Sequence, residues 1–205
     1  SIEVRAGTYP AFKRRNIMRV NPKIIQALSM FVPKKDIRPY LLNINFELQI
    51  NRTILTACNG HVLLCVCLQE ENEKEDTFKI PLLSFQKTTI DYEITRGEDG
   101  KVYVTNGLVK VEVPQDEYKY PDIRRAIPTT LDVKVNGTKT YDAEYLLLFK
   151  KASKLLGGRE HPVIQSNDIV DIGLSNVVGL NMPVILQQYV PVVSVSPEWL
   201  ELPQK

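Results

Sequence analysis

The feature that most constrains the fold of this chain is a change of hydrophobic period near position 40. Before it, apolar residues recur at the spacing of one helix face over positions 21–32, and Asn21 and Pro22 suit the N-cap and the first helical position. From Tyr40 to Gln49, apolar and polar residues alternate, which is typical of a half-buried strand. The sequence therefore predicts a helix followed by strands.

The same order, a helical or short apolar segment followed by a strand meander, recurs further along the chain. Turn signals at Asn59–Gly60 and Asn106–Gly107 separate neighbouring strands. A second long helix is predicted from about Asp142 to Leu156, closed by Gly157–Gly158, and a helix of one or two turns is possible at Leu82–Phe85. Besides the strand from Tyr40, strands are expected at 53–57, 62–68, 89–95, 101–105, 108–113, 131–135, 163–165, 169–174, 184–189 and 192–195.

These meanders divide the chain into three units and predict an α+β fold with repeated helix-plus-antiparallel-strand units. The first unit covers about 17–69 and the second about 77–121, separated by the acidic stretch Glu70–Asp76, which is predicted to be a solvated loop. The two units form a domain over 1–128 that ends in a linker, and residues 129–205 form the third unit.

Composition excludes several classes of protein. The chain is 43% hydrophobic and 24% charged, so it is neither disordered nor of low complexity. With 26 basic and 24 acidic residues, any affinity for nucleic acid depends on where the basic residues lie. Cys58, Cys65 and Cys67 do not form a disulfide framework, and zinc-ligand spacings are missing. Without a long apolar run or signal peptide, a cytoplasmic location is expected.

The sequence contains none of the common catalytic motifs. There is no phosphate-binding glycine loop with lysine, no His-Glu-x-x-His and no complete nucleophile elbow, since Gly173–Val177 matches that elbow only in part and is predicted to be a turn. We therefore expect no catalytic residues, no metal site and no cofactor. A hydrolase with a site built from scattered loop carboxylates is the alternative, and no motif supports it.

Two segments resemble one known family. Thr56–Leu63 resembles the Thr-Asp-Gly-His-Arg-Leu turn of the bacterial DNA polymerase III beta subunit, the sliding clamp. Tyr120–Pro128 closely resembles the Phe-Pro-Asp-Tyr-Arg-Arg-Val-Ile-Pro linker of the same family. Further similar segments, in the same order and spacing over roughly 17–193, are Asp36–Leu41, Leu131–Gly137 and Tyr145–Leu147.

The departures from the family pattern are also specific. Val62 stands where the family usually has Arg, Cys58 and Asn59 replace Thr-Asp, and Ala126 replaces a larger Val. The first domain of the clamp and the first half of its third domain have no counterpart. The chain thus resembles a shortened, divergent clamp of the kind that a phage or mobile element would encode.

The resemblance implies a DNA-clamp fold, in which helices line the hole of a ring and sheets form its outside. It implies a DNA polymerase processivity factor without catalytic activity, a homo-oligomer that encircles double-stranded DNA. Such a ring needs only a diffuse positive lining that contacts phosphates. The candidate DNA-facing residues are Lys23, Lys150, Lys151 and Lys154, which could instead be the ordinary solvated faces of two helices.

The resemblance also implies a groove between two domains, where clamps bind short hydrophobic peptides of polymerases and clamp loaders. The groove residues, carried over by matching position, are Cys58, Gly60, His61, Val62, Leu63, Pro121, Arg125, Ala126, Val190 and Val192. The alternative interpretation of these segments is a hairpin turn and an interdomain strut. The missing units also leave open a second function, that of a clamp-fold adaptor or inhibitor that binds replication proteins without forming a ring.

Overall fold

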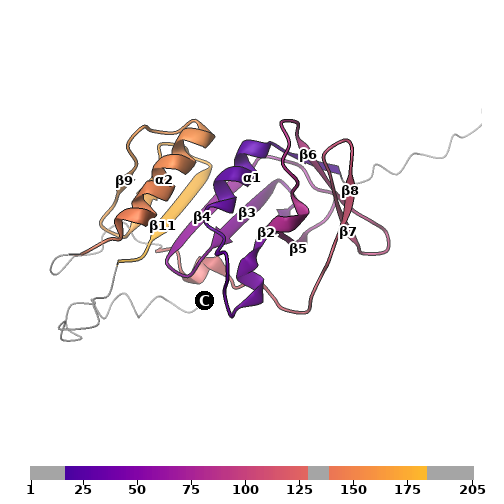
Figure 1. The fold of residues 1–205 in the computed structure, drawn as a ribbon, viewed down its shortest axis with the longest axis horizontal. Helices are drawn as coiled ribbons and strands as arrows, with labels where there is room; N and C mark the ends of the chain where they lie inside the picture. Colours follow the sequence, from indigo (N-terminus) through magenta and orange to yellow (C-terminus); the bar gives the residue numbers. More distant parts are fainter. Residues whose placement is uncertain (1–16, 129–138, 184–205) are drawn as a thin grey trace, which may run out of the picture.

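The strands of the chain form two antiparallel sheets in a computed structural model that describes residues 17–128 and 139–183 (Figure 1). The larger sheet has the order β5-β2-β3-β4-β11-β10-β9, built from β2 (Asn43–Gln49), β3 (Arg52–Cys58), β4 (Val62–Leu68), β5 (Asp76–Pro81), β9 (Val163–Ile164), β10 (Ile169–Asp171) and β11 (Val177–Asn181). The smaller sheet has the order β1-β6-β7-β8, built from β1 (Ile17–Val20), β6 (Tyr92–Arg96), β7 (Val102–Thr105) and β8 (Lys110–Val113).

Local signals define the two α-helices, α1 (Pro22–Ser29) and α2 (Ala143–Leu156). The Asn21 side chain caps α1 by accepting a hydrogen bond from the Lys23 amide, and the Asp142 side chain caps α2 in the same way. Gly157 ends α2 in the left-handed conformation, at a φ of 78°. Both predicted helices are confirmed. They could be predicted because their capping residues are adjacent in the sequence to the turns that they cap.

The two helices lie side by side on one face of the larger sheet (Figure 1). The rings of Phe31, just beyond α1, and Phe149, in α2, meet edge to face with centroids 5.0 Å apart. One hydrophobic core contains residues of both helices and both sheets, and its largest fully buried side chains include Phe31, Phe46 and Phe149. Residues far apart in the sequence thus share one core.

The pairing of β4 with β11 joins the predicted first and third units in one sheet. Five residue pairs connect these strands, from Val177 opposite Val66 to Asn181 opposite Val62. β11 is a strand that the sequence pattern does not predict, and it contains Gly179. A Cβ at Gly179 would lie 2.6 Å from the Phe149 ring, so glycine is needed here for close packing of α2 rather than for a turn.

β1 and β5 are also strands that the sequence pattern does not predict, and other boundaries differ slightly from those predicted. The strand expected at 169–174 ends at Asp171, whose carboxylate accepts a hydrogen bond from the Gly173 amide at a φ of 81°. Three 3-10 turns are present among the described residues: η1 (Pro39–Leu42), η2 (Leu82–Ser84) and η3 (Ile123–Arg125). The helix expected in the second unit, at Leu82–Phe85, is present only as the single turn η2. The strands expected at 131–135, 184–189 and 192–195 lie outside the described residues.

Candidate functional site

The segment after β8 crosses the face of the larger sheet that is opposite to the helices, and we call residues 114–128 the strap. Its start is fixed by Lys79 of β5, whose buried ammonium contacts the Asp116 carboxylate and the Tyr118 carbonyl. Further along, Arg124 donates to Glu47 of β2 at 2.6 Å. Burial by itself would raise the pKa of Glu47, but hydrogen bonds from Arg124 and Gln49 outweigh it and leave the pKa lowered.

Tyr120 joins the strap to Tyr40 of η1, the turn before β2. Its ring meets the Tyr40 ring edge to face, with centroids 6.4 Å apart. Burial is the main cause that raises the pKa of the Tyr120 hydroxyl, with the neighbouring Cys58 and Cys65 thiols acting in the same direction. The hydroxyl therefore stays protonated, and Tyr120 acts as a fixed wall of the site.

The turn η3 covers a small hydrophobic cluster at the junction of β4 and β11. Leu63, Cys65 and Leu180 form this cluster, and the strap residues Ile123 and Ile127 pack against it. Successive residues of β4 point to opposite faces of the sheet, so Leu63 faces the strap. The strap leaves its own Pro121, Arg125 and Ala126 exposed around this cluster.

The turn between β3 and β4 forms the other wall. The Asn59 side chain accepts hydrogen bonds from the amides of His61 and Val62, each at 2.9 Å. Gly60 has a φ of 91°, and a Cβ there would lie 2.9 Å from Nη2 of Arg38. The Arg38 guanidinium thus lies over Gly60.

Arg38 is held in place by a two-point interaction with Asp36. Its Nε and Nη2 atoms donate to the two oxygens of the Asp36 carboxylate at 2.8 and 2.9 Å. The hydrogen bonds from Arg38 lower the pKa of Asp36 to about 2. Both groups are therefore charged across the physiological pH range.

The structure brings together only part of the predicted groove. Cys58 and Leu63 lie on the strap face, Gly60 lies in the turn under Arg38, and Pro121, Arg125 and Ala126 are exposed on the strap. Val62 is buried on the opposite, helix-covered face. The His61 ring stacks on Tyr145 of α2 with centroids 5.5 Å apart. The predicted groove residues outside the described part of the chain are Val190 and Val192.

Sequence reasoning missed two residues of this site. Arg38 and Tyr40 belong to the segment Asp36–Leu41, which carries part of the family resemblance but was not assigned to the groove. Their place follows from tertiary contacts with Gly60 and Tyr120, which are 22 and 80 positions away from them, respectively. The paired Asp-x-Arg spacing was the only local signal for a fixed guanidinium.

The four candidate DNA-facing lysines lie on the helix side of the sheet. Lys23 is exposed on α1, and Lys150, Lys151 and Lys154 are exposed on α2. Within residues 17–128 and 139–183, none of these four forms an ion pair. Their charge is therefore not neutralised by described neighbours, and they are on the face opposite to the strap.

The described part of the chain contains no cluster of three or more His, Cys, Asp or Glu residues that could hold a metal ion. Neither α1 nor α2 has the length and apolarity of a membrane-spanning helix. The surface at the β4–β11 junction has apolar walls and a few fixed charges.

Two antiparallel sheets, the larger one carrying two helices side by side on one face, define the fold of a DNA sliding clamp. No protein-family model and no curated protein matches the sequence. Among solved structures, the chain is similar to DNA polymerase III beta subunits. For the Thermotoga maritima protein the TM-score is 0.61 at 15% identity, covering 89% of this chain and 68% of that one.

Two further beta subunits give the same result. The match to the Pseudomonas aeruginosa protein has a TM-score of 0.63 at 14% identity, covering 88% of this chain and 70% of that one. The match to the Borrelia burgdorferi protein, solved with a natural product, has a TM-score of 0.64 at 14% identity, covering 87% and 67%. The predicted resemblance and the α+β clamp fold are thus confirmed at the level of the fold.

Proposed function

We propose that this chain is a sliding-clamp-like processivity factor, without catalytic activity, that encircles double-stranded DNA and tethers replication proteins. The observation that carries the proposal is the clamp fold over almost nine-tenths of the chain, with two helices adjacent on one face of a continuous sheet. The exposed lysines of α1 and α2 supply a positive surface suited to phosphates, and such contacts need no sequence information.

The proposed assembly is a homo-oligomer of chains with three units each, of which 1–128 holds two and 129–205 the third. The outer strands are β1 and β8 in the smaller sheet and β5 and β9 in the larger sheet, and each keeps one edge unpaired among the described strands. Unpaired edges are natural sites for pairing with another chain, and a head-to-tail pairing that closes generates a ring.

Native mass spectrometry and retention on DNA test this proposal together. We expect an oligomer that stays on a nicked circular plasmid and slides off after the plasmid is linearised. A chain that remains monomeric, or that is retained equally on both forms, contradicts an encircling clamp.

The proposed partner site is the surface formed by the strap, the β3–β4 turn and Arg38. Apolar walls with few polar groups suit an inserted Leu or Phe side chain of a partner peptide. Leu63 is only 3% exposed and packs under the strap, so its substitution would test folding rather than binding. Ala126→Asp and Arg125→Glu change exposed positions instead.

A hydrophobic clamp-binding peptide provides the test of this surface. We expect Ala126→Asp to weaken capture of the peptide about tenfold, as placing a charge in an apolar contact does. The matched control is Ala143→Asp, at an exposed position in the first turn of α2. Equal capture by both variants would remove the peptide site from this face.

A second candidate function is that of a clamp-fold adaptor or inhibitor that binds replication proteins without a ring. The observation that favours it is the reduction of the second unit's helix to the three residues of η2, which leaves less helical surface to face DNA. Peptide capture by a chain that is monomeric and is not retained on circular DNA would select this function over the first.

A further inference from the structure

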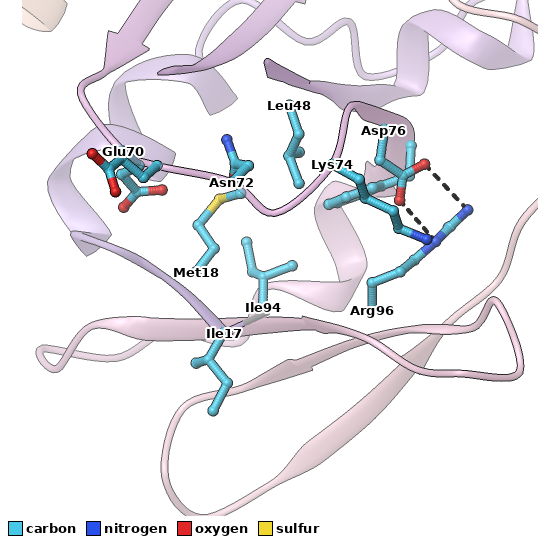
Figure 2. Close-up of a pocket in the computed structure, with 11 residues that line it drawn as sticks. Ile17, Met18, Leu48, Glu70, Asn72, Lys74, Asp76, Ile94 and Arg96 are labelled. Carbon is cyan, nitrogen blue, oxygen red and sulfur yellow. Dashed lines mark hydrogen bonds and ion pairs between the residues drawn. The ribbon is translucent and has the colours of Figure 1, made fainter. Parts of the chain in front are cut away.

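A pocket of about 300 Å³ lies between the two sheets, away from the strap and from the lysines of the helices (Figure 2). Its floor is apolar and comes from both sheets: Met18, Leu48, Phe78 and Ile94 are all nearly buried. Figure 2 shows Met18 and Ile94 pointing toward the loop that carries Asn72, with Leu48 beside the same loop. The floor can therefore receive an apolar side chain.

The loop that forms the rim is held in a defined position. The Asn72 side chain donates to the Gln49 carbonyl at 2.7 Å and to the Thr53 hydroxyl at 3.0 Å, and its amide donates to the Ile50 carbonyl at 2.9 Å. The acidic stretch, predicted from sequence to be a solvated loop, is thus anchored across the β2–β3 turn. The pocket wall is pre-formed, which lowers the entropy lost on binding.

One end of the pocket is closed by an ion pair. Arg96 Nε lies 3.0 Å from the Asp76 carboxylate, and the guanidinium lies over the Phe78 ring, 5.6 Å from its centroid. Because Asp76 already neutralises Arg96, this arginine is not free to attract an anionic ligand. The remaining charge at the rim decides which ligands are favoured.

That remaining charge is negative. The loop carries Glu70, Glu71, Glu73 and Glu75 against a single Lys74, and within the described ranges none of these glutamates forms an ion pair. Glu70 is partly buried, and this burial raises its pKa. A cation placed beside Glu70 would supply a counter-charge that no described neighbour provides.

We propose that this pocket binds a peptide segment of a partner protein in which a bulky apolar side chain is flanked by Lys or Arg. The apolar side chain occupies the floor formed by Met18, Leu48 and Ile94, and the basic residues meet Glu70 and Glu71. The same rim repels nucleic acid and acidic peptides, so the partner differs in charge from the ligand of the lysine face. This site is separate from the strap surface and does not depend on it.

A fluorescein-labelled peptide Gly-Ser-Lys-Phe-Lys-Arg-Ser-Gly, titrated into the full chain and followed by anisotropy, tests the proposal. We expect saturable binding below about 1 mM that weakens with added salt. Two control peptides separate the apolar contribution to binding from the electrostatic one. In the first, Phe is replaced by Ser, and in the second, the basic residues are replaced by Glu. Both should bind at least about fivefold more weakly, and binding of either control at the strength of the parent peptide overturns the proposal.

The place of binding is read from the methionine methyl groups, because the chain has three methionines and only Met18 lines the pocket. In the chain labelled with 13C-methyl methionine, the parent peptide should shift the signal of Met18 and leave those of Met30 and Met182 unchanged. Binding without a shift of Met18 overturns the assignment to this pocket.

A charge reversal at the rim completes the test. Glu71→Lys, at an exposed position, should weaken binding of the parent peptide roughly three- to fivefold and reduce its salt dependence. Glu117→Lys, at an exposed position on the strap, is the matched control and should bind as the unchanged chain does. An equal effect of both substitutions would indicate attraction to net charge only and would overturn a specific site.

Discussion

The aromatic rings of Phe31 and Phe149 meet edge to face, 5.0 Å apart, and this contact joins the helix of the first unit to the helix of the third. Both rings are at most 1% exposed, and Phe149 also packs on Gly179 of β11. The two helices and the β4–β11 pairing therefore stabilise each other, and the surface that carries the four lysines depends on this contact.

Phe149→Ala should lower the free energy of unfolding by about 3–5 kcal/mol, because it removes a fully buried aromatic ring and leaves a cavity. Leu147→Ala, on the same helix but 54% exposed, should change the same quantity by less than about 1 kcal/mol. Urea unfolding followed by circular dichroism measures both. Similar effects of the two substitutions would mean that α2 does not depend on the Phe31 contact.

The Arg124–Glu47 ion pair should contribute little at neutral pH, about 0.5 kcal/mol, because the Arg124 side chain is 55% exposed and the pair is screened by solvent. The pKa of Glu47 is lowered in the folded state, so this stabilisation is present above the unfolded pKa of about 4.3 and is lost as pH falls through the folded value.

A double-mutant cycle with Arg124→Ala and Glu47→Gln, measured by urea unfolding at about pH 6 and about pH 3, checks both statements. The coupling energy should shrink at the lower pH. A coupling that grows on acidification would contradict the sign of the pKa shift.

Cys65 should react with a thiol reagent more slowly than Cys67. Cys65 is 6% exposed, and burial, together with the neighbouring Cys58 thiol, raises its pKa to about 12 against a smaller opposing effect of Thr56. Because the thiolate is the reactive form, alkylation of Cys65 by iodoacetamide in the native chain should be at least about tenfold slower than that of the partly exposed Cys67. Mass spectrometry of the digested protein measures the rates, and equal rates in urea provide the control.

Neutralising the lysines of α2 should reduce the salt dependence of DNA binding. Each phosphate contact that is lost lowers the slope of log K against log salt by about 0.9. Lys150→Gln and Lys154→Gln should each show this decrease in a filter-binding titration with duplex DNA. Lys119→Gln, on the strap and therefore on the opposite face, should leave the slope unchanged, and the opposite outcome would place DNA on the strap side.

The helices, and the turns that are closed by local hydrogen bonds, could be predicted from the sequence. Asn21 with Pro22, and Asp142 with Gly157, mark helix ends by contacts with residues two to four positions away. The β3–β4 connection was also predictable, since Asn59 bonds to the amides of its own turn. These features depend only on neighbours in the chain, so a single sequence contains their cause.

The strand β11 and the composition of the site depended on tertiary structure. The Asn176 side chain reaches the Cys67 carbonyl across 109 positions, and Gly179 is needed because the Phe149 ring and the Val170 carbonyl lie close to it. Val62 and Leu63 are adjacent in the sequence, yet strand geometry sends them to opposite faces and removes Val62 from the strap surface.

The sequence alone determined the α+β class, the two α-helices, most strands of the first two units and the resemblance to sliding clamps, because hydrophobic period, caps and turn residues act locally. Only the tertiary structure decided that β4 pairs with β11, that Arg38 lies over Gly60, and that Asn72 anchors the acidic loop above an apolar pocket. Those relationships join residues distant in the chain, and the free energy of such contacts depends on the packing of the whole core rather than on any local pattern.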